Sequence, residues 1–374
     1  MEKVYTSQNV HEAFLERLSF LLDEFDTLYV SFSGGKDSGL LLSLVMDNAG
    51  SVPGKRIGLF HQDFEAQFRH TTEYVERTFQ RYGDDCESYW CCLPMASKTN
   101  LSMEDAWWYP WDPDCKERWA RPLPSSPFVV SLENNPFGFY RMKMEQSRFY
   151  KGFGKWWQDK HGGKSCALIG MRADESLSRY SAVVNKKDPY KGRHWITRNS
   201  ADTFTAYPLY DWTVEDVWTA YGRFGYDYNR LYDLYAMAGL PPKKMRVSSP
   251  FNEWATKDLR LYKEIDPEMW DVLSRRVPGA CFGALYGNTA AMGNGRVILP
   301  EGHTWDSYAA FLLETVPERE RARYAMEKDP YTRCRMIMAN STKGAKRSVS
   351  KRKGNDNDER KRRLREMMMG GKAK

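Results

Sequence analysis

The sequence predicts an α/β protein whose core is a doubly wound parallel sheet. Apolar runs suited to buried strands alternate with segments of helical composition, beginning at residues 28–32 and 40–46, and the turn between these first two segments is rich in glycine. Strands that alternate with helices at this spacing form parallel βαβ units. Ligands bind such sheets beyond the carboxyl ends of the strands, so this turn is also the first candidate site.

The other elements are expected in the following order. A helix at residues 11–25 should precede the first strand, because its apolar side chains recur at helical spacing between charged ones. The turn residues SVPGK (51–55) should separate the next helix from the second strand. Further strands are expected at 56–60, 87–93 and 165–169, and further helices at 65–82 and 142–160, the last of them ended by a pair of glycines.

Composition divides the chain into three parts. Residues 1–240 hold the sheet, with an insertion at about 96–140 in which tryptophan and proline replace regular periodicity; it could be a lid, a partner surface or a packed flap. Residues 241–342 indicate a mostly helical subdomain, with helices at 254–276 and 305–338 around a glycine-rich segment at 279–295. Residues 343–374 form a basic tail, whose scarcity of apolar side chains predicts disorder.

The turn SGGKDS (33–38) has the chemistry of a phosphate-binding loop. Two glycines allow backbone conformations closed to other residues and let amide N–H groups approach a ligand. These amides, the serine hydroxyls and the start of the helix favour an anion, and the lysine adds a positive charge. The spacing differs from the GxxxxGK[ST] pattern of P-loop NTPases. The nucleotide-binding residues expected here are Ser31, Ser33, Gly34, Gly35, Lys36, Asp37 and Ser38.

SGGKDS at the end of a first strand resembles the pyrophosphate loop (PP-loop) of the ATP-pyrophosphatase family. That family includes phosphoadenosine-phosphosulfate (PAPS) reductases, the small subunit of ATP sulfurylase and several tRNA-modifying enzymes. The resemblance implies the Rossmann-like, adenine nucleotide alpha hydrolase-like fold. It also implies that ATP or a related adenine nucleotide binds, with chemistry between the α and β phosphates.

Acidic residues follow the second expected strand. The segment HQDFE (61–65) lies at its carboxyl end, beside the expected phosphate loop. Asp63, with Asp37, could hold Mg²⁺ or orient the nucleotide, and an acidic residue after this strand is similar to PAPS-reductase-like proteins. Asp63 could instead cap the next helix. For Glu65 the sequence favours neither a functional nor a structural role.

A second motif follows the strand at 165–169. Its residues fit G-x-R-x-x-E-S-x-x-R, which is similar to a segment of PAPS reductases and ATP sulfurylase small subunits. Arginine forks bind phosphate or sulfate oxygens in pairs, and the glutamate can hold one fork in position. The alternative is a surface ion-pair cluster. The motif adds Gly170, Arg172, Glu175, Ser176 and Arg179 to the nucleotide site, and the expected catalytic residues are Lys36, Asp37, Asp63, Arg172 and Arg179.

Two later segments extend the likeness. Residues 207–218 are similar to the P-L-x-D-W-T-x-x-D-V-W stretch of the same superfamily, and Thr213 with Asp216 forms a near capping box there, which favours a structural role. YNRLYD (228–233) continues the likeness, and residues 246–252, 266–270 and 276–280 resemble the PAPS-reductase-like subgroup with a C-terminal domain of unknown function, which includes the IbrA-type co-activators of prophage genes. This resemblance implies a ParB/sulfiredoxin-like partner.

The seven cysteines argue against redox chemistry. Their number is odd and no C-x-x-C occurs, so neither a disulfide framework nor a zinc or iron–sulfur site is expected. PAPS reductases carry their nucleophile in a Glu-Cys-Gly-Leu-His segment, which has no counterpart here: Cys281 lies in ACFG and Cys334 in RCR. Reduction of PAPS is therefore disfavoured.

Hydropathy indicates where the protein is located, and charge indicates which partners its tail could bind. No apolar run is long enough for a membrane span and the N-terminus has no signal-peptide pattern, so a cytoplasmic location is expected. The tail has thirteen Lys and Arg against four Asp and Glu, a net charge of +9 that leaves −2 for the rest of the chain out of a total of +7. Such a tail could bind nucleic acid or only aid solubility. An oligomer or hetero-complex is expected.

Two functions of different kinds follow. The first is an ATP-dependent enzyme that releases pyrophosphate and activates an acceptor by adenylylation, in nucleotide or nucleic-acid modification or in phage-related regulation or defence. The second is a nucleotide-binding regulator or co-activator that contacts nucleic acid or a ParB-like partner without turnover. The complete set of charged residues favours the enzyme, since a pure binder need not keep a full site.

Overall fold

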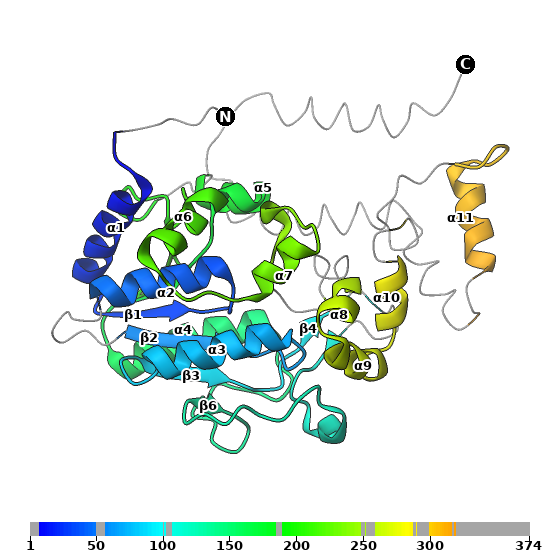
Figure 1. Ribbon diagram of the computed structural model, residues 1–374, viewed down its shortest axis with the longest axis horizontal. Coiled ribbons are helices and arrows are strands. Elements are labelled where there is room, and N and C mark those ends of the chain that lie inside the picture. The colour runs from blue at the N-terminus through cyan, green and yellow to red at the C-terminus, as the bar shows by residue number, and fades with distance from the viewer. Residues whose placement is uncertain are drawn as a thin grey trace. The chain divides into compact units, whose positions relative to one another are not determined.

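The computed structural model describes residues 7–49, 57–99, 101, 107–184, 189–247, 251, 259–286, 289, 299–315 and 318. The chain forms two compact units, Met1–Gly295 and Arg296–Lys374. The first unit contains the sheet (Figure 1). In the second, α11 (Trp305–Glu314) begins with a capping box formed by Thr304 and Ser307. The basic tail predicted at 343–374 lies outside the described residues.

A seven-stranded sheet forms the centre of the first unit. Its order is β6-β3-β2-β1-β7-β9-β8, and all neighbouring strands are parallel except β8 and β9. The chain runs outward from β1 to β6 and then returns beside β1 as β7, which confirms the doubly wound α/β prediction. The strands are β1 (Thr27–Ser31), β2 (Ile57–Gln62), β3 (Glu87–Cys91), β6 (Val129–Val130), β7 (Ser165–Ile169), β8 (Ile196–Arg198) and β9 (Thr203–Ala206).

The reversal of strand order places the two sequence motifs together. A crevice for ligands opens where neighbouring strands lead the chain in opposite directions. Here that point lies between β1 and β7, which pair in register from Thr27 with Ser165 to Ser31 with Ile169. The glycine-rich turn follows β1, and the arginine motif follows β7. Both motifs therefore leave the sheet side by side, at the same edge.

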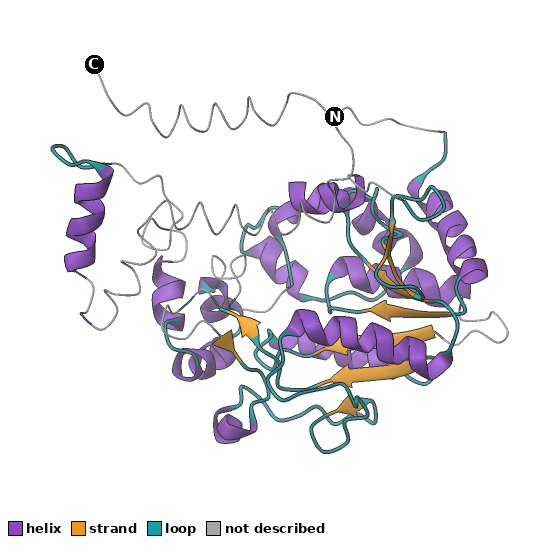
Figure 2. Cartoon of the chain, turned by 180° about the vertical axis from the view of Figure 1, so that it is seen from behind, coloured by secondary structure: helices purple, strands orange, loops and turns teal. Residues whose placement is uncertain are grey.

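Helices cover both faces of the sheet (Figures 1 and 2). On one face the buried side chains of four helices share a core with the strands. On the other face Phe149, Phe153 and Trp157 of a single long helix pack on Tyr29 and Phe60. The helices of the first face are α1 (Val10–Glu24), α2 (Lys36–Ala49), α3 (Arg69–Tyr82) and α6 (Val214–Phe224), and the helix of the second face is α4 (Gln146–His161).

A second core joins the later helices to the loop after β2. Phe68 stacks on Tyr262 with ring centroids 3.5 Å apart. Asp266 accepts hydrogen bonds from the backbone N–H groups of Arg69 at 2.8 Å and Met269 at 3.4 Å, so one carboxylate caps the starts of α3 and α9. The remaining helices are α5 (Leu177–Val184), α7 (Leu231–Met237), α8 (Arg260–Ile265), α9 (Pro267–Arg276) and α10 (Ala280–Tyr286).

Several boundaries differ from the sequence-based expectations. The helix expected at 65–82 begins at Arg69, because Glu65 has a positive φ of 62° that no α-helix allows. The helix expected from 142 begins at Gln146. The expected glycine-rich separator contains α10, and α11, which ends at Glu314, covers the first part of the helix expected at 305–338. Of the residues beyond 315, only 318 is described.

The Trp/Pro-rich segment at 96–140 is not wholly an insertion. Its β6 pairs with β3 and forms one edge of the main sheet. Short strands β4 (Ser97–Lys98) and β5 (Trp107–Trp108) pair with each other, and a 3₁₀ helix, η1 (Pro113–Arg118), follows.

Among the described residues, no helix is both long and apolar enough to cross a bilayer.

Candidate functional site

The turn after β1 is built to leave backbone amides open. Gly34 has a φ of +77°, which favours glycine, and a Cβ at this position would also make a tight contact of 3.0 Å with Thr71 Cγ2. Neither the Gly34 nor the Gly35 amide has a hydrogen-bond acceptor among the described residues. These two N–H groups precede the start of α2 at Lys36, which is the arrangement that binds phosphate at helix N-termini.

The two serines of the turn hold it closed. The Ser38 hydroxyl lies 2.9 Å from the Ser33 hydroxyl, accepts a hydrogen bond from Ser33 N at 3.1 Å and donates to Gly35 O at 3.1 Å. Both hydroxyls are therefore engaged within the turn itself. Ser31, also expected at the site, is the last residue of β1 and pairs in register with Phe60 and Ile169.

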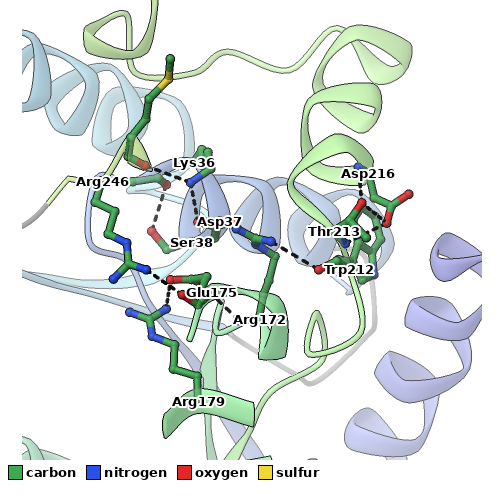
Figure 3. Close-up of polar contacts among 12 residues, drawn as sticks. Lys36, Asp37, Ser38, Arg172, Glu175, Arg179, Trp212, Thr213, Asp216 and Arg246 are labelled. Atoms are coloured by element: carbon green, nitrogen blue, oxygen red, sulfur yellow. Dashed lines mark hydrogen bonds and ion pairs between the residues drawn. The ribbon is translucent and has the colours of Figure 1, made fainter. Parts of the chain in front are cut away.

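Lys36 is buried at the turn, with 4% of its surface exposed. Its Nζ donates to Asp37 Oδ2 at 3.1 Å and to the backbone oxygen of Met245 at 3.4 Å (Figure 3). The ammonium group also lies 5.3 Å from the centre of the Tyr232 ring. Burying an ammonium group is costly unless such partners compensate the loss of water. The lysine side chain is thus fixed by Asp37, Met245 and Tyr232.

Asp37 connects the turn to the second motif. Arg172 donates from Nε to Asp37 Oδ1 at 2.6 Å and from NH1 to Trp212 O at 3.4 Å, and only 3% of its surface is exposed. Asp37 therefore lies between two cations. Gly170 makes this approach possible, because a Cβ there would stand 2.6 Å from Asp37 O. The structure thus brings together Lys36, Asp37, Gly170 and Arg172 as the sequence predicts.

Glu175 contacts two arginines, Arg179 and Arg246 (Figure 3). Its carboxylate pairs with Arg179, the contact that the sequence analysis expects of this glutamate. Its backbone oxygen accepts a hydrogen bond from Arg246 NH2 at 2.8 Å. Ser176 accepts the N–H of Arg179 on its hydroxyl at 3.3 Å. The segment after β7 is therefore ordered by its own side chains and by one residue from beyond α7.

Three side chains that the sequence analysis did not select fix the backbone of the turn. Tyr232 accepts the Lys36 N–H on its hydroxyl at 3.0 Å, and Tyr221 donates its hydroxyl to Lys36 O at 2.7 Å. Asn229 donates to Gly34 O at 2.9 Å. Two of them, Asn229 and Tyr232, lie in YNRLYD (228–233), a segment to which the family resemblance gives no role. The capping box of Thr213 and Asp216 is confirmed at the start of α6.

Asp63 and Glu65 bind protein partners instead of facing the turn. Asp63 accepts hydrogen bonds from Trp90 Nε1 at 2.7 Å, Arg121 NH2 at 2.5 Å and Glu65 N at 2.7 Å. No described contact links it to residues 33–38. It does not cap α3 either, whose N-cap residue is Phe68. These two acidic side chains attach the Trp/Pro-rich segment to the end of β2.

The donors around Asp63 also bear on the predicted magnesium site. Burial alone would raise the pKa of Asp63, but the charges of Arg121 and His61 and the Trp90 N–H lower it below its usual value. The carboxylate is thus ionised and already paired on both oxygens. Among the described residues no group of three His, Cys, Asp or Glu side chains could hold a metal ion. Of the two predicted magnesium ligands, Asp37 is the one at the turn.

The cysteines described by the structure are free thiols. Four of them, Cys86, Cys91, Cys92 and Cys166, are buried. Burial raises the pKa of Cys91, Cys92 and Cys166 well above the usual thiol value, which disfavours the nucleophilic thiolate. Cys281 is exposed on α10, and Cys334 lies outside the described residues.

Comparison with solved structures finds relatives of low identity. A PAPS reductase from Candida auris in complex with phosphate shares 13% identity with a TM-score of 0.31, covering 63% of this chain and 94% of that one. An FMN adenylyltransferase from Candida glabrata with FAD and pyrophosphate shares 13% with a TM-score of 0.33, covering 62% and 64%. The U34-tRNA thiolase NcsA from Methanococcus maripaludis, with its [4Fe-4S] cluster, shares 10% with a TM-score of 0.34, covering 80% and 85%.

Sequence comparison is more specific. The uncharacterized protein YbdN of Escherichia coli K12 is 34% identical over 328 residues, which cover 86% of this chain and 79% of that protein. A domain of unknown function (DUF3440) matches residues 239–334. The phosphoadenosine phosphosulfate reductase domain matches residues 27–237, more than half of the chain and the part that holds the turn, the sheet and the arginine motif. The chain therefore belongs to the phosphoadenosine phosphosulfate reductase domain family.

Proposed function

We propose that this chain binds ATP at residues 33–38 and cleaves it between the α and β phosphates. An acceptor oxygen attacks the α phosphorus, the bond to the bridging oxygen of the β phosphate breaks, and its electron pair leaves with pyrophosphate. The products are an adenylylated acceptor and pyrophosphate. Family membership supports a nucleotide as ligand, and the geometry of the turn supports this class of reaction.

The observation that carries the proposal is the position of Lys36. Its ammonium group is buried and held by Asp37, and the residue directly follows Gly34 and Gly35, whose amides are open. Donors fixed before the reaction stabilise charge that develops on a leaving group, and they are most effective where water is excluded. Negative charge develops on the departing pyrophosphate. Lys36 and the two amides would therefore lower the barrier to its release.

In this proposal Mg²⁺ binds to the site only together with the nucleotide. Mg²⁺ keeps several waters and is bound through one or two carboxylates together with substrate phosphates. Asp37 is the carboxylate at the turn and would exchange its contact with Lys36 or Arg172 for the ion, whereas Asp63 contacts Trp90 and Arg121 away from the turn. A bound ion would neutralise phosphate charge. Arg172, fixed by Asp37 through its Nε, would orient the phosphates from the β7 side of the crevice.

A second candidate is a nucleotide-binding regulator that does not turn ATP over. Lys36 is nearly enclosed and contacts Met245 O, which belongs to the second family domain. A sensor could report nucleotide binding through this contact. The acceptor, a phage-related setting, a ParB-like partner, an oligomeric assembly and nucleic-acid binding by the tail stay predictions from the resemblance and the charge pattern.

The test is pyrophosphate release from ATP and Mg²⁺, with and without RNA or DNA. We expect Lys36→Ala to lower release by about a hundredfold or more, the usual effect of removing one such donor. Lys151→Ala, an exposed lysine of α4, is the matched control and should behave as wild type. Equal release by both variants would refute the enzyme. ATP binding without release by any protein would favour the regulator.

A further inference from the structure

A short segment of the DUF3440 domain reaches into the candidate site. We name residues 245–247 the strap; they follow a 3₁₀ turn, η3 (Pro242–Lys244). Met245 O accepts the hydrogen bond from Lys36 Nζ, and Arg246 NH2 donates to Glu175 O. Val247 Cβ lies 3.8 Å from where a Cβ on Gly35 would stand. Met245 and Arg246 thus bind the phosphate loop and the arginine motif, and Val247 lies beside Gly35.

The strap is held in place by protein packing. Met245 is buried in the second core together with Tyr232 and Tyr235. Tyr235 also donates its hydroxyl to Arg246 O at 3.5 Å. Tyr232 in turn fixes Lys36 through its backbone N–H. The position of Arg246 therefore depends on the same aromatic residues that fix the loop, and its guanidinium is directed toward Glu175 before any ligand arrives (Figure 3).

These contacts link four cationic side chains in one part of the site. Asp37 lies between Lys36 and Arg172, while Glu175 binds Arg179 on its carboxylate and Arg246 on its backbone oxygen. Several cationic side chains gathered in a partly buried site favour a ligand with several negative charges. Arginine forks match phosphate oxygens especially well.

We infer that Arg246 binds the polyphosphate end of the nucleotide, together with Lys36 and Arg179. The DUF3440 domain is then part of the nucleotide site and selects ligands with two or more linked phosphates over monophosphates. This inference rests on the proposed function, because it identifies the linked phosphates as the part of the nucleotide that the same site recognises. If Arg246 served only to anchor the strap, its loss would weaken all ligands of the site alike.

The experiment measures binding of pyrophosphate, ATP and AMP to the full chain by calorimetry. Arg246→Ala should weaken pyrophosphate and ATP about tenfold to a hundredfold, the effect of one charge-assisted hydrogen bond, and change AMP binding less than about twofold. Lys244→Ala removes an exposed positive charge two residues away and should bind as wild type. Arg179→Ala, which leaves the strap intact, should show the same selective loss as Arg246→Ala.

Two results would overturn the inference. One is pyrophosphate binding by Arg246→Ala that equals binding by Lys244→Ala. The other is an equal loss of AMP and pyrophosphate affinity in Arg246→Ala, which would make the residue a structural anchor. Wild-type protein that binds none of the three ligands would refute the proposed function itself, so the two failures are distinguishable. Thermal unfolding of each variant shows whether Arg246→Ala folds, and Arg179→Ala supplies the same test if it does not.

Discussion

Arg276 of α9 donates two hydrogen bonds to the buried carboxylate of Glu65, from Nε and NH2, both 3.1 Å long. The two residues are 211 positions apart in the chain. The same carboxylate accepts the backbone N–H groups of Trp111 at 2.6 Å and Ala120 at 2.7 Å. One side chain therefore joins the loop after β2 to the Trp/Pro-rich segment and to the DUF3440 domain. This explains why Glu65 leaves the helix that its neighbours predict.

Arg276→Ala should destabilise the protein by about 3–5 kcal/mol, because it leaves the Glu65 charge buried without its cation. The measurement is urea unfolding followed by tryptophan fluorescence. Arg275→Ala is the matched control, since Arg275 is exposed and pairs with Asp271 on the surface, and it should change stability by less than about 1 kcal/mol. Equal effects of the two substitutions would show that the buried pair does not join the domains.

Asp63→Asn separates the predicted metal role from the ion pair with Arg121. The substitution removes the charge that compensates Arg121, so we expect a loss of about 2–4 kcal/mol of stability. The Mg²⁺ concentration for half-maximal pyrophosphate release should stay unchanged. Asp37→Asn, at the phosphate loop, is the comparison in which that concentration should rise. A tenfold higher Mg²⁺ requirement in Asp63→Asn would restore Asp63 as a metal ligand.

Tyr232→Phe tests whether the phosphate loop is held in advance of binding. Removing the hydroxyl leaves the buried Lys36 N–H without its acceptor, which costs about 1–3 kcal/mol. We expect ATP affinity to fall about tenfold, with the loss appearing in nucleotide binding as well as in unfolding. Tyr226→Phe removes a hydroxyl that bonds Asp47, in the second half of α2, and serves as the control. Unchanged ATP affinity in Tyr232→Phe would mean that the loop orders itself.

The parts of the site that the sequence predicted are those encoded locally. SGGKDS and the arginine motif each lie within ten residues, and strand order brings them together at the junction of β1 and β7. A strand–turn–helix pattern and the chemistry of its side chains are both visible in such short segments. The doubly wound sheet was predictable for the same reason. Lys36, Asp37 and Arg172 therefore meet as expected.

The parts that were not predicted depend on distant partners. Asp63 is 58 residues from Arg121, and Lys36 is 196 residues from Tyr232 and 209 from Met245. An acidic residue after a strand has the same local sequence whether it faces a ligand or a buried arginine. Only the packing of the later segments decides between these roles. The same holds for β6, two residues whose strand character comes from pairing with β3.

Glu24 at the end of α1 gives the protein an acid-sensitive contact. Hydrogen bonds from Lys191, Tyr190 and Lys164 lower the pKa of Glu24 from 4.5 to about 2. Because the folded-state pKa is depressed, the stabilisation is complete above about pH 4.5 and is lost as the pH falls toward 2. Its lysine partners are 42% and 52% exposed, so solvent screening limits the contribution to about 1 kcal/mol.

Glu24→Gln should therefore be less stable than wild type by about 1 kcal/mol at pH 7, and the difference should shrink to zero near pH 2. The measurement is the free energy of unfolding in urea at a series of pH values. Glu16→Gln, an exposed carboxylate on the same helix, corrects for the change in net charge. A stability difference between wild type and Glu24→Gln that stays constant from pH 7 to pH 2 would contradict the assignment. It would mean that the lysines and Tyr190 bind the glutamine amide as well as the carboxylate, and that packing rather than charge holds the end of α1.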